Sequence, residues 1–366
     1  MMRILHVVSV MDVGGMESFI MNLYRHMDRS RIQFDFLTHH GRRGAFEEEI
    51  EALGGRVYHI PLMDDLNLVR YRAALGRLFG EHPEYRIVHG HLGSTALWYL
   101  GEAERQGVPW RILHSHVPAR PPTVKGYVKD FLFHFSPRHA NIRLACSTEA
   151  GRYQFKGLPF EVIPNGIDVD RFRFDSAVRQ EVRKRLGLGD AFVVGHVGRF
   201  HVEKNHAYLL RLFKALHDQE PKAALLLIGT GELMERTKAL AEELGLGRSV
   251  CFLGLQKDCA PFYQAMDAFV LPSLYEGLPL TGVEAQCAGL PCLFTDQASP
   301  ALGLSPSVRF LPADEAGAER WVKALREICR RPAERKAPSP AVMAFDAARV
   351  AQAMAERYEA LWEKKA

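Results

Sequence analysis

Short runs of apolar residues, each the length of a β-strand, alternate along the first half of the chain with stretches of helical periodicity. The strand-like runs occupy residues 4–10, 33–40, 56–61, 86–91, 110–116 and 142–147. Apolar positions at helical spacing fill the intervals at residues 16–27, 46–54, 68–82 and 95–107. This alternation is typical of a parallel β-sheet covered by helices on both faces.

The same alternation resumes after residue 190. Strand-like runs recur at residues 191–198, 223–231, 250–254, 268–273 and 291–296. Between the two series, the stretch "FEVIPNGIDVDRFRF" combines a strand with Pro-Asn-Gly turn residues and predicts a hinge near 165–175. We therefore predict an α/β protein of two similar doubly wound, Rossmann-like domains, over residues 1–168 and 169–345, which face each other across a cleft.

The end of the chain carries a further helical pattern, with Val350, Met354, Tyr358 and Leu361 at helical spacing. This segment lies beyond the last strand of the second domain. We expect residues 346–366 to form a helix that crosses back and packs on the N-terminal domain.

Composition narrows the class of protein without naming a function. The chain has 366 residues, 47% hydrophobic and 25% charged, which suits two globular domains. Its formal net charge of +4 is only mildly basic, which permits anionic ligands and does not indicate a nucleic-acid partner. The six cysteines form no CxxC pair, and no signal peptide or membrane-length apolar run is present. We expect a cytoplasmic protein whose membrane contact, if it has one, is peripheral.

Ligands of open α/β sheets bind beyond the carboxyl ends of the strands, so the loops at those ends are the places to look for chemistry. In the second domain the loop "GRFHVEKN" places Arg199 and Lys204 after a strand and before a helix that starts near Asn205. A guanidinium fork, a mobile ammonium and a helix N-terminus together suit a diphosphate. The alternative is two solvated basic residues in a loop.

The stretch "PSLYEGLPLTGVEAQCAGLP" places two glutamates, Glu276 and Glu284, at another strand end. Pro279 stands where the first helical turn is expected, which exposes the backbone N–H groups of Gly277 and Leu278 to a ligand. Glu284 then falls about two turns into the helix. Such a pair can accept hydrogen bonds from sugar hydroxyls. A metal site is disfavoured because no other ligand-type residue stands at ligand spacing, and helix capping explains only Glu276.

In the N-terminal domain, Gly14 and Gly15 follow the first strand, where they let the backbone approach a ligand phosphate. A tight turn is the alternative. The full GxGxxG pattern is missing, which counts against a dinucleotide oxidoreductase.

Histidine is concentrated in the first half: twelve of the sixteen precede residue 166. "VHGH" and "ILHSH" place His89, His91, His114 and His116 at the ends of two successive strands. Single histidines at strand ends are usually structural, but two pairs favour a cleft-facing site. Their spacing also allows a metal site, which we do not expect.

The segment from His116 to Arg143 holds five Lys/Arg residues, one acid (Asp130) and the aromatic stretch "GYVKDFLFHF". Such a segment suits peripheral contact with an anionic membrane, and a core helix with one solvated face is the alternative.

The sequence resembles the retaining glycosyltransferases of family four, which have the GT-B fold. The matching stretches are "GGMESF" (14–19), "VIPNGIDVDRF" (162–172), "GRFHVEKN" (198–205), "FLG" (252–254) and "PSLYEGLPLTGVEAQCAGLP" (272–291). The form "EGLPLTGVEAQ" departs from the commoner "EGFG" and resembles the subgroup that builds capsular polysaccharides and exopolysaccharides.

The resemblance implies a nucleotide-sugar donor on the C-terminal domain and an acceptor on the N-terminal domain. Arg199 and Lys204 would hold the diphosphate, Glu284 the ribose hydroxyls and Glu276 the transferred sugar. His114 would contact the donor sugar, and His91 and His116 would lie on the acceptor side. Backbone around Gly254 and Leu255 would select the base, with UDP the family-weighted choice.

The resemblance further implies a glycan or polyprenyl-diphosphate-linked acceptor and no cofactor or metal. The acceptor would attack on the same face as the leaving diphosphate, which takes its proton, so catalysis is mainly positioning and charge stabilisation. Two other functions remain open: a nucleotide-sugar epimerase of similar fold, and a non-catalytic scaffold that binds nucleotide or glycan. The glutamate spacing counts against the first and the intact charged set against the second.

Overall fold

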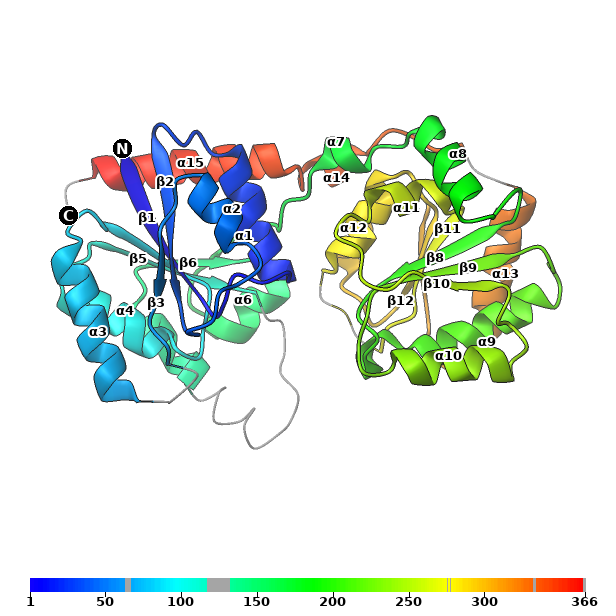
Figure 1. Cartoon of the computed structure of the whole chain (residues 1–366), viewed down its shortest axis with the longest axis horizontal. Coiled ribbons are helices and arrows are strands. Elements are labelled where there is room, and N and C mark those ends of the chain that lie inside the picture. The colour runs from blue at the N-terminus through cyan, green and yellow to red at the C-terminus, as the bar shows by residue number, and fades with distance from the viewer. Residues whose placement is uncertain (63–66, 117–131, 275, 277, 332–333, 365–366) are drawn as a thin grey trace. The chain divides into compact units, whose positions relative to one another are not determined.

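The structure is a computed structural model that describes residues 1–62, 67–116, 132–274, 276, 278–331 and 334–364. It divides into two compact units, Met1–Gly166 with Asp346–Ala366, and Ile167–Phe345 (Figure 1). The division therefore follows Gly166, where the sequence placed it after residue 168. The prediction of two Rossmann-like α/β domains is confirmed.

The first unit is built on a seven-stranded sheet in the order β3-β2-β1-β4-β5-β6-β7, and every strand pairs in parallel with its neighbours. Its strands are β1 (Met2–Val8), β2 (Ile32–Thr38), β3 (Val57–His59), β4 (Ile87–Gly90), β5 (Trp110–Ser115), β6 (Ile142–Ala145) and β7 (Glu161–Val162). Its helices are α1 (Gly15–His26), α2 (Glu47–Ala52), α3 (Leu68–Glu81), α4 (Ala96–Arg105), η1 (Ser136–His139), α6 (Thr148–Phe155) and α15 (Ala347–Glu363).

The second unit repeats this topology in a six-stranded parallel sheet of order β10-β9-β8-β11-β12-β13. Its strands are β8 (Val193–Val197), β9 (Ala224–Ile228), β10 (Val250–Phe252), β11 (Ala268–Leu271), β12 (Cys292–Thr295) and β13 (Val308–Leu311). Its helices are α7 (Val169–Phe172), α8 (Ser176–Arg185), η2 (Val202–Lys204), α9 (His206–His217), α10 (Met234–Glu243), α11 (Ala260–Ala265), α12 (Leu280–Cys287), η3 (Pro300–Leu302), α13 (Ala318–Arg330) and α14 (Pro340–Met343).

In both sheets the strand order reverses direction next to the first strand, between β1 and β4 and between β8 and β11. In open α/β sheets the connections on either side of such a point run to opposite faces, which leaves a crevice beyond the strand ends. Open α/β sheets bind ligands at this switch point. The fold therefore directs attention to the loops that follow these four strands.

Side chains of β1 alternate between two cores on opposite faces of the first sheet. Ile4 and Val8 join the core that contains residues of α1 and α15, whereas Leu5 and Val7 join the core that contains residues of α3 and α4. Figure 1 shows these helices on opposite sides of the sheet. Tyr358 of α15 is fully buried in the first of these cores.

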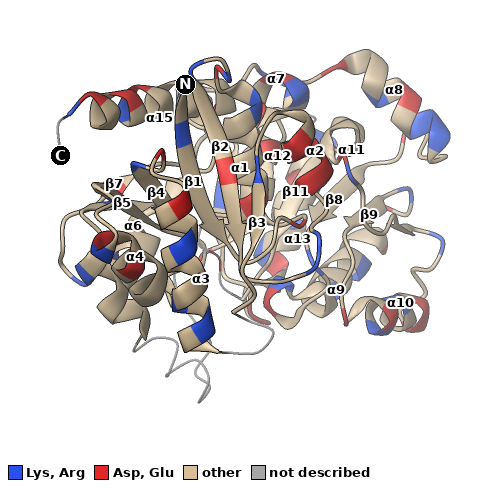
Figure 2. Cartoon of the chain, turned by 60° about the vertical axis from the view of Figure 1, so that its left-hand side comes forward, with Lys and Arg blue, Asp and Glu red and all other residues tan. Residues whose placement is uncertain are grey.

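Charged residues lie mainly on helices and loops, and the strands carry few of them (Figure 2). A buried exception joins β1 to β2, where Arg3 donates from Nε to Asp35 over 2.5 Å. Asp35 also accepts hydrogen bonds from the hydroxyl of Tyr85 and the backbone N–H of Arg56, so the buried carboxylate is fully hydrogen-bonded. Among the described helices, none is both long enough and apolar enough to cross a membrane.

Candidate donor and acceptor sites at the two switch points

The loop after β8 comes close to the loop after β9. Gly229 has φ of 135°, and a Cβ atom there would lie 2.1 Å from the carbonyl oxygen of Gly198. The contact therefore requires glycine at position 229. The next residue along the first loop is Arg199, whose side chain is 70% exposed and whose Nη2 lies 3.5 Å from a carboxylate oxygen of Glu232. Arg199 is thus a loosely held cation at the edge of the switch point.

Lys204 and Glu276 form an ion pair across the switch point, since Lys204 follows β8 and Glu276 follows β11. Their side chains are only 20% and 12% exposed, so solvent screens the pair weakly. The hydroxyl of Ser273 donates to the same carboxylate oxygen of Glu276 over 2.7 Å. The sequence predicted both charged residues as site residues but did not predict their pairing.

Backbone contacts fix the two loops relative to each other. The N–H of Leu274 donates to the carbonyl of Glu203 over 2.8 Å, and the side-chain amide of Asn205 donates to the carbonyl of Pro272 over 3.2 Å. Asn205 holds a left-handed conformation with φ of 55°, which asparagine tolerates better than most residues. These contacts hold Lys204 and Glu276 within reach of one ligand.

Glu284 is the fifth residue of α12, which begins at Leu280. It therefore lies just over one turn into the helix, and Pro279 is the N-cap residue rather than part of the first turn. The sequence therefore placed Glu284 about one turn too far into the helix and Pro279 one position too far, because the helix starts later than expected.

The carboxylate of Glu284 accepts a hydrogen bond of 2.7 Å from the hydroxyl of Tyr263. Burial raises the pKa of Glu284 to about 7, although the Tyr263 hydrogen bond acts in the opposite direction. The carboxyl group is therefore close to half protonated at neutral pH. Tyr263 on α11 was not predicted as a site residue, since an aromatic residue in a helix carries no signal that separates it from the core.

The turn after β10 contains Gly254 and Leu255, which the resemblance assigned to the base. Gly254 has φ of 66°, and its carbonyl accepts a hydrogen bond of 2.9 Å from the N–H of Gly229. Leu255 is 66% exposed. Backbone contacts thus connect the loop after β9 both to the loop after β8 and to the loop after β10. Leu278 is partly buried against the core of this unit, and Gly277 lies outside the described residues.

In the first unit, Gly14 and Gly15 follow β1 at its own switch point. Gly14 is the N-cap of α1 in an extended conformation, and a side chain at Gly15 would meet nothing within 4 Å. Neither backbone conformation requires glycine. A Cβ atom at Gly14 would lie 2.4 Å from a carboxylate oxygen of Glu17, and contact of these glycines with a ligand stays a prediction.

Five histidines line one face of the first sheet: His6 on β1, His89 and His91 at β4, and His114 and His116 at β5. Residues two apart on a strand share a face, and His6 is the register partner of His89. The sequence predicted four members of this cluster and missed His6.

Ring nitrogens connect this cluster. His89 Nε2 lies 3.2 Å from His114 Nδ1, and His91 Nδ1 lies 2.9 Å from His116 Nε2. Burial lowers the pKa of His114 well below its ordinary value and that of His116 to about 3. These imidazoles are therefore neutral at physiological pH. Most of the predicted basic segment, residues 117–131, lies outside the described residues.

Comparison with known proteins shows the class to which this architecture belongs. The family model described as "Glycosyl transferases group 1" matches residues 178–341, and the "Glycosyl transferase 4-like domain" model matches residues 14–166. The chain therefore belongs to the family-four glycosyltransferases of the GT-B fold, as its sequence motifs predicted.

Individual relatives agree with this assignment. The chain is 36% identical over 303 residues to the "Putative glycosyltransferase EpsF" of Bacillus subtilis, covering 80% of this chain and 79% of the relative. It is 30% identical over 256 residues, 66% of each chain, to the "UDP-Gal:alpha-D-GlcNAc-diphosphoundecaprenol alpha-1,3-galactosyltransferase" of Escherichia coli.

Solved structures support the fold. Anabaena HepE in complex with UDP-glucose matches with a TM-score of 0.79 at 19% identity over 98% of this chain and all of that one. Sucrose-phosphate synthase from Thermosynechococcus elongatus matches with a TM-score of 0.78 at 18% identity, covering 99% of each chain. At these identities the likeness concerns the fold alone.

Proposed function

We propose that this glycosyltransferase moves a sugar from a UDP-sugar to a polyprenyl-diphosphate-linked glycan with retention of anomeric configuration, as a step in polysaccharide assembly. The observation that carries the proposal is the Lys204–Glu276 ion pair at the switch point between β8 and β11. Arg199 stands near the start of the same loop, two residues after β8 ends. The Escherichia coli relative is a UDP-Gal-dependent enzyme and the similar Anabaena structure holds UDP-glucose, and both favour UDP as the nucleotide.

The ion pair suggests how donor binding reorganises the site. A diphosphate beside Lys204 and Arg199 would neutralise both cations, since paired phosphates carry more charge than one carboxylate. Glu276 would then exchange its partner for the hydroxyls of the transferred sugar. Ser273, which already donates to Glu276, would keep the carboxylate in place during this exchange.

The reaction needs no enzyme nucleophile. An acceptor hydroxyl attacks the anomeric carbon on the face that the diphosphate leaves, the carbon–oxygen bond to the diphosphate breaks, and the proton of the acceptor passes to the departing phosphate oxygen. Arg199 and Lys204 stabilise the charge that develops on the diphosphate. The resemblance assigns His114, neutral through burial, to the donor sugar.

A thermal-shift panel of nucleotide-sugars tests the donor. A ligand at 100 times its dissociation constant stabilises the folded protein by about 2.7 kcal/mol. UDP-sugars should raise the melting temperature of the protein more than GDP-sugars or ADP-sugars do. With the best donor and a lipid-linked acceptor, the anomeric configuration of the product tests retention. An epimerised free sugar nucleotide would indicate the epimerase instead, and no UDP release under any condition would indicate a scaffold.

Turnover should need no divalent metal, because Arg199, Lys204 and helix ends meet the diphosphate's charge. We expect initial rates in EDTA to equal those with added Mg²⁺ or Mn²⁺. Complete loss of turnover in EDTA, restored by either ion, would contradict the prediction.

The polyprenyl acceptor implies work at the inner face of the cell membrane, with the basic segment from His116 to Arg143 as the contact. Flotation with anionic vesicles at low salt should recover more protein than flotation with neutral vesicles or at high salt. Equal recovery in every case would count against membrane contact through this segment.

Glu276 and Glu284 should act on different parts of the donor. Glu284→Gln should weaken UDP and UDP-sugar equally, because ribose is present in both, and Glu276→Gln should lower turnover more than UDP affinity. Since the pKa of Glu284 is about 7 and the ionised form accepts ribose hydroxyls, UDP affinity should rise about tenfold from about pH 6 to about pH 8.

Glu284→Gln is the control for that pH dependence, because UDP titrates too and only the difference between the two proteins reports on Glu284. Equal pH profiles for both would contradict the assigned role. If Glu276→Gln lowers UDP affinity as much as Glu284→Gln does and leaves turnover intact, the division of roles is wrong.

A further inference from the structure

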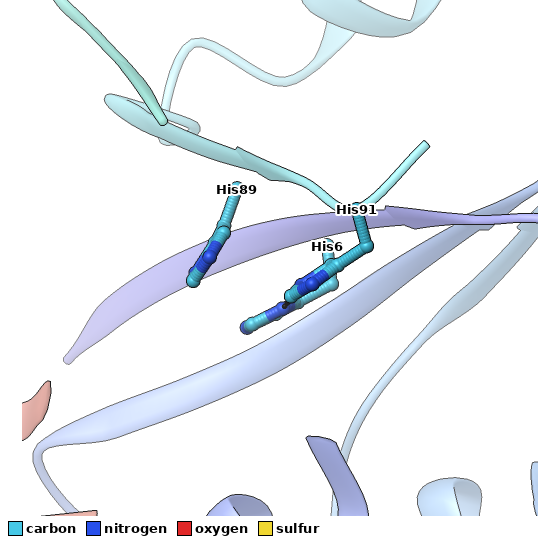
Figure 3. A group of neighbouring side chains, drawn as sticks. All are labelled: His6, His89 and His91. Atoms are coloured by element: carbon cyan, nitrogen blue, oxygen red, sulfur yellow. Dashed lines mark hydrogen bonds between the residues drawn. The ribbon is translucent and has the colours of Figure 1, made fainter. Parts of the chain in front are cut away.

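The five-histidine cluster of the first unit contains more buried nitrogen than the proposed reaction uses. His114 is predicted near the sugar and His91 and His116 near the acceptor, whereas His6 and His89 have no predicted role. Figure 3 shows His6, His89 and His91 side by side on the sheet. All three are buried, and one ring nitrogen from each lies within 4.8 Å of the others. Phe34 and Phe36 pack against the ring of His6, so the surroundings are apolar.

Neutral imidazoles cannot satisfy one another completely in this arrangement. One chain of contacts runs from His6 Nδ1 to His91 Nε2 (3.0 Å) and from His91 Nδ1 to His116 Nε2 (2.9 Å). Each neutral ring has one N–H and one lone pair. Whichever way the protons point, one N–H at an end of the chain stays unbonded, at His6 Nε2 or at His116 Nδ1.

Those two atoms are in fact buried without a hydrogen-bond partner among the described residues, as is His114 Nε2 in the neighbouring chain of contacts. An unsatisfied buried polar atom costs stability. Three such atoms show that the neutral rings of this cluster do not satisfy one another.

We propose that His6, His89 and His91 form a binding site for a divalent first-row transition metal, with Zn²⁺ as the expected ion. Imidazole nitrogen suits Zn²⁺, Cu²⁺ and Ni²⁺, whereas Mg²⁺ and Ca²⁺ require oxygen ligands. Zinc–nitrogen bonds of about 2.0–2.1 Å place tetrahedral ligand atoms roughly 3.3 Å apart. The 3.0 Å between His6 Nδ1 and His91 Nε2 needs only a small expansion to admit the ion.

The surroundings of the triad orient its rings as outer partners of metal sites do. Nδ1 of His89 lies 2.6 Å from the hydroxyl of Tyr358, and Nδ1 of His91 lies 2.9 Å from His116 Nε2. Both contacts occupy Nδ1, so the ion would bind Nε2 of His89 in place of its contact with His114 Nδ1 (3.2 Å) and Nε2 of His91 in place of its contact with His6 Nδ1 (3.0 Å). A second triad, His91, His114 and His116, also has the required spacing. All three of its members are predicted to meet the sugar or the acceptor, whereas only His91 of the first triad is.

The proposed ion would join β1 to β4 at the first switch point, because His6 comes from β1 while His89 lies on β4 and His91 directly follows it. Its role is to stabilise the first unit, beneath the acceptor side. This role differs from a metal at the donor diphosphate, because Mg²⁺ and Mn²⁺ at that place would meet phosphate oxygens.

Zinc titration of the full chain, freed of metal by prolonged dialysis against a chelator, tests the site. We expect uptake of one equivalent of Zn²⁺, and Zn²⁺ at 100 times its dissociation constant should lower the unfolding equilibrium constant roughly a hundredfold. Mg²⁺ at the same concentration should do neither. Co²⁺ should give the intense visible spectrum of a four-coordinate site.

His6→Phe is the diagnostic variant, since a phenyl ring fits among Phe34 and Phe36, and exposed His26→Gln is its control. Uptake should be lost in the first and kept in the second. No uptake by the wild type, or equal uptake by His6→Phe, would overturn the proposal. If His6→Phe does not fold, the Co²⁺ spectrum of the wild type decides: the weak spectrum of a six-coordinate, oxygen-ligated ion would overturn it equally.

Discussion

Replacing Lys204 with alanine should lower turnover by roughly two to three decades, because the variant loses a charge that stabilises the leaving diphosphate. The structure adds a second reason for a large effect. Without the ammonium group, the mostly buried carboxylate of Glu276 keeps Ser273 as its one side-chain partner among the described residues. The measurement is kcat and KM for the best UDP-sugar, together with UDP affinity.

Lys238→Ala provides the control, since this lysine belongs to the same unit and pairs with Glu235 on the surface of α10. Its turnover should equal that of the wild type. The double variant Lys204→Ala with Glu276→Gln separates the loss of the lysine charge from the effect of the unpaired Glu276 carboxylate. If the unpaired carboxylate contributes, the double variant should be more active than the two single losses of activity together imply. Turnover of Lys204→Ala within a few fold of the wild type would remove Lys204 from the site.

Strands and helices were predictable here because their burial follows simple periods. In β1, Ile4 and Val8 face one core and Leu5 and Val7 face the other, so the strand is apolar on both sides and appears as a continuous run. In α15, Val350, Met354, Tyr358 and Leu361 are all buried, which is the helical spacing that the sequence shows. Local patterns of this kind require no knowledge of the neighbouring elements.

Contacts between distant residues were not predictable, because they depend on strand order. Lys204 and Glu276 are 72 residues apart and meet only because β8 lies beside β11. His6 joins the histidines of β4 for the same reason, since β1 lies beside β4 rather than β3. A single histidine in an apolar strand gives no sign of this.

The start of α12 illustrates a more local limit. Proline is common in the first helical turn, and that preference placed Pro279 inside the helix, yet the structure makes it the N-cap. Helix boundaries vary by one or two residues. Glu284 keeps its place beside Tyr263 because its position depends on packing of α12 against α11.

Replacing Tyr358 with alanine should destabilise the first unit by about 3–5 kcal/mol, the usual cost of removing a buried aromatic ring. The ring is fully buried, meets Phe34 edge-on at 6.0 Å between centroids, and its hydroxyl lies 2.6 Å from His89 Nδ1. Tyr358 lies on the chain's last helix, which belongs to the first unit although the rest of that unit ends at Gly166. Unfolding of the first unit should therefore depend on residues that follow the second.

Urea unfolding in the presence of EDTA, followed by hydrogen exchange of peptides from β1 and from β8, measures this effect for each unit separately. Tyr358→Ala should speed exchange in β1 and leave β8 unchanged, because Tyr358 and its buried neighbours on α15 belong to the core of the first unit. Tyr358→Phe keeps the ring and removes the partner of His89, so its cost should be smaller, about 1–3 kcal/mol. Exposed Gln352→Ala on the same helix should change stability by less than about 0.5 kcal/mol. Equal exchange in β1 for Tyr358→Ala and Gln352→Ala would mean that α15 contributes little to the stability of the first unit, and its packing in the structure would then have no energetic counterpart.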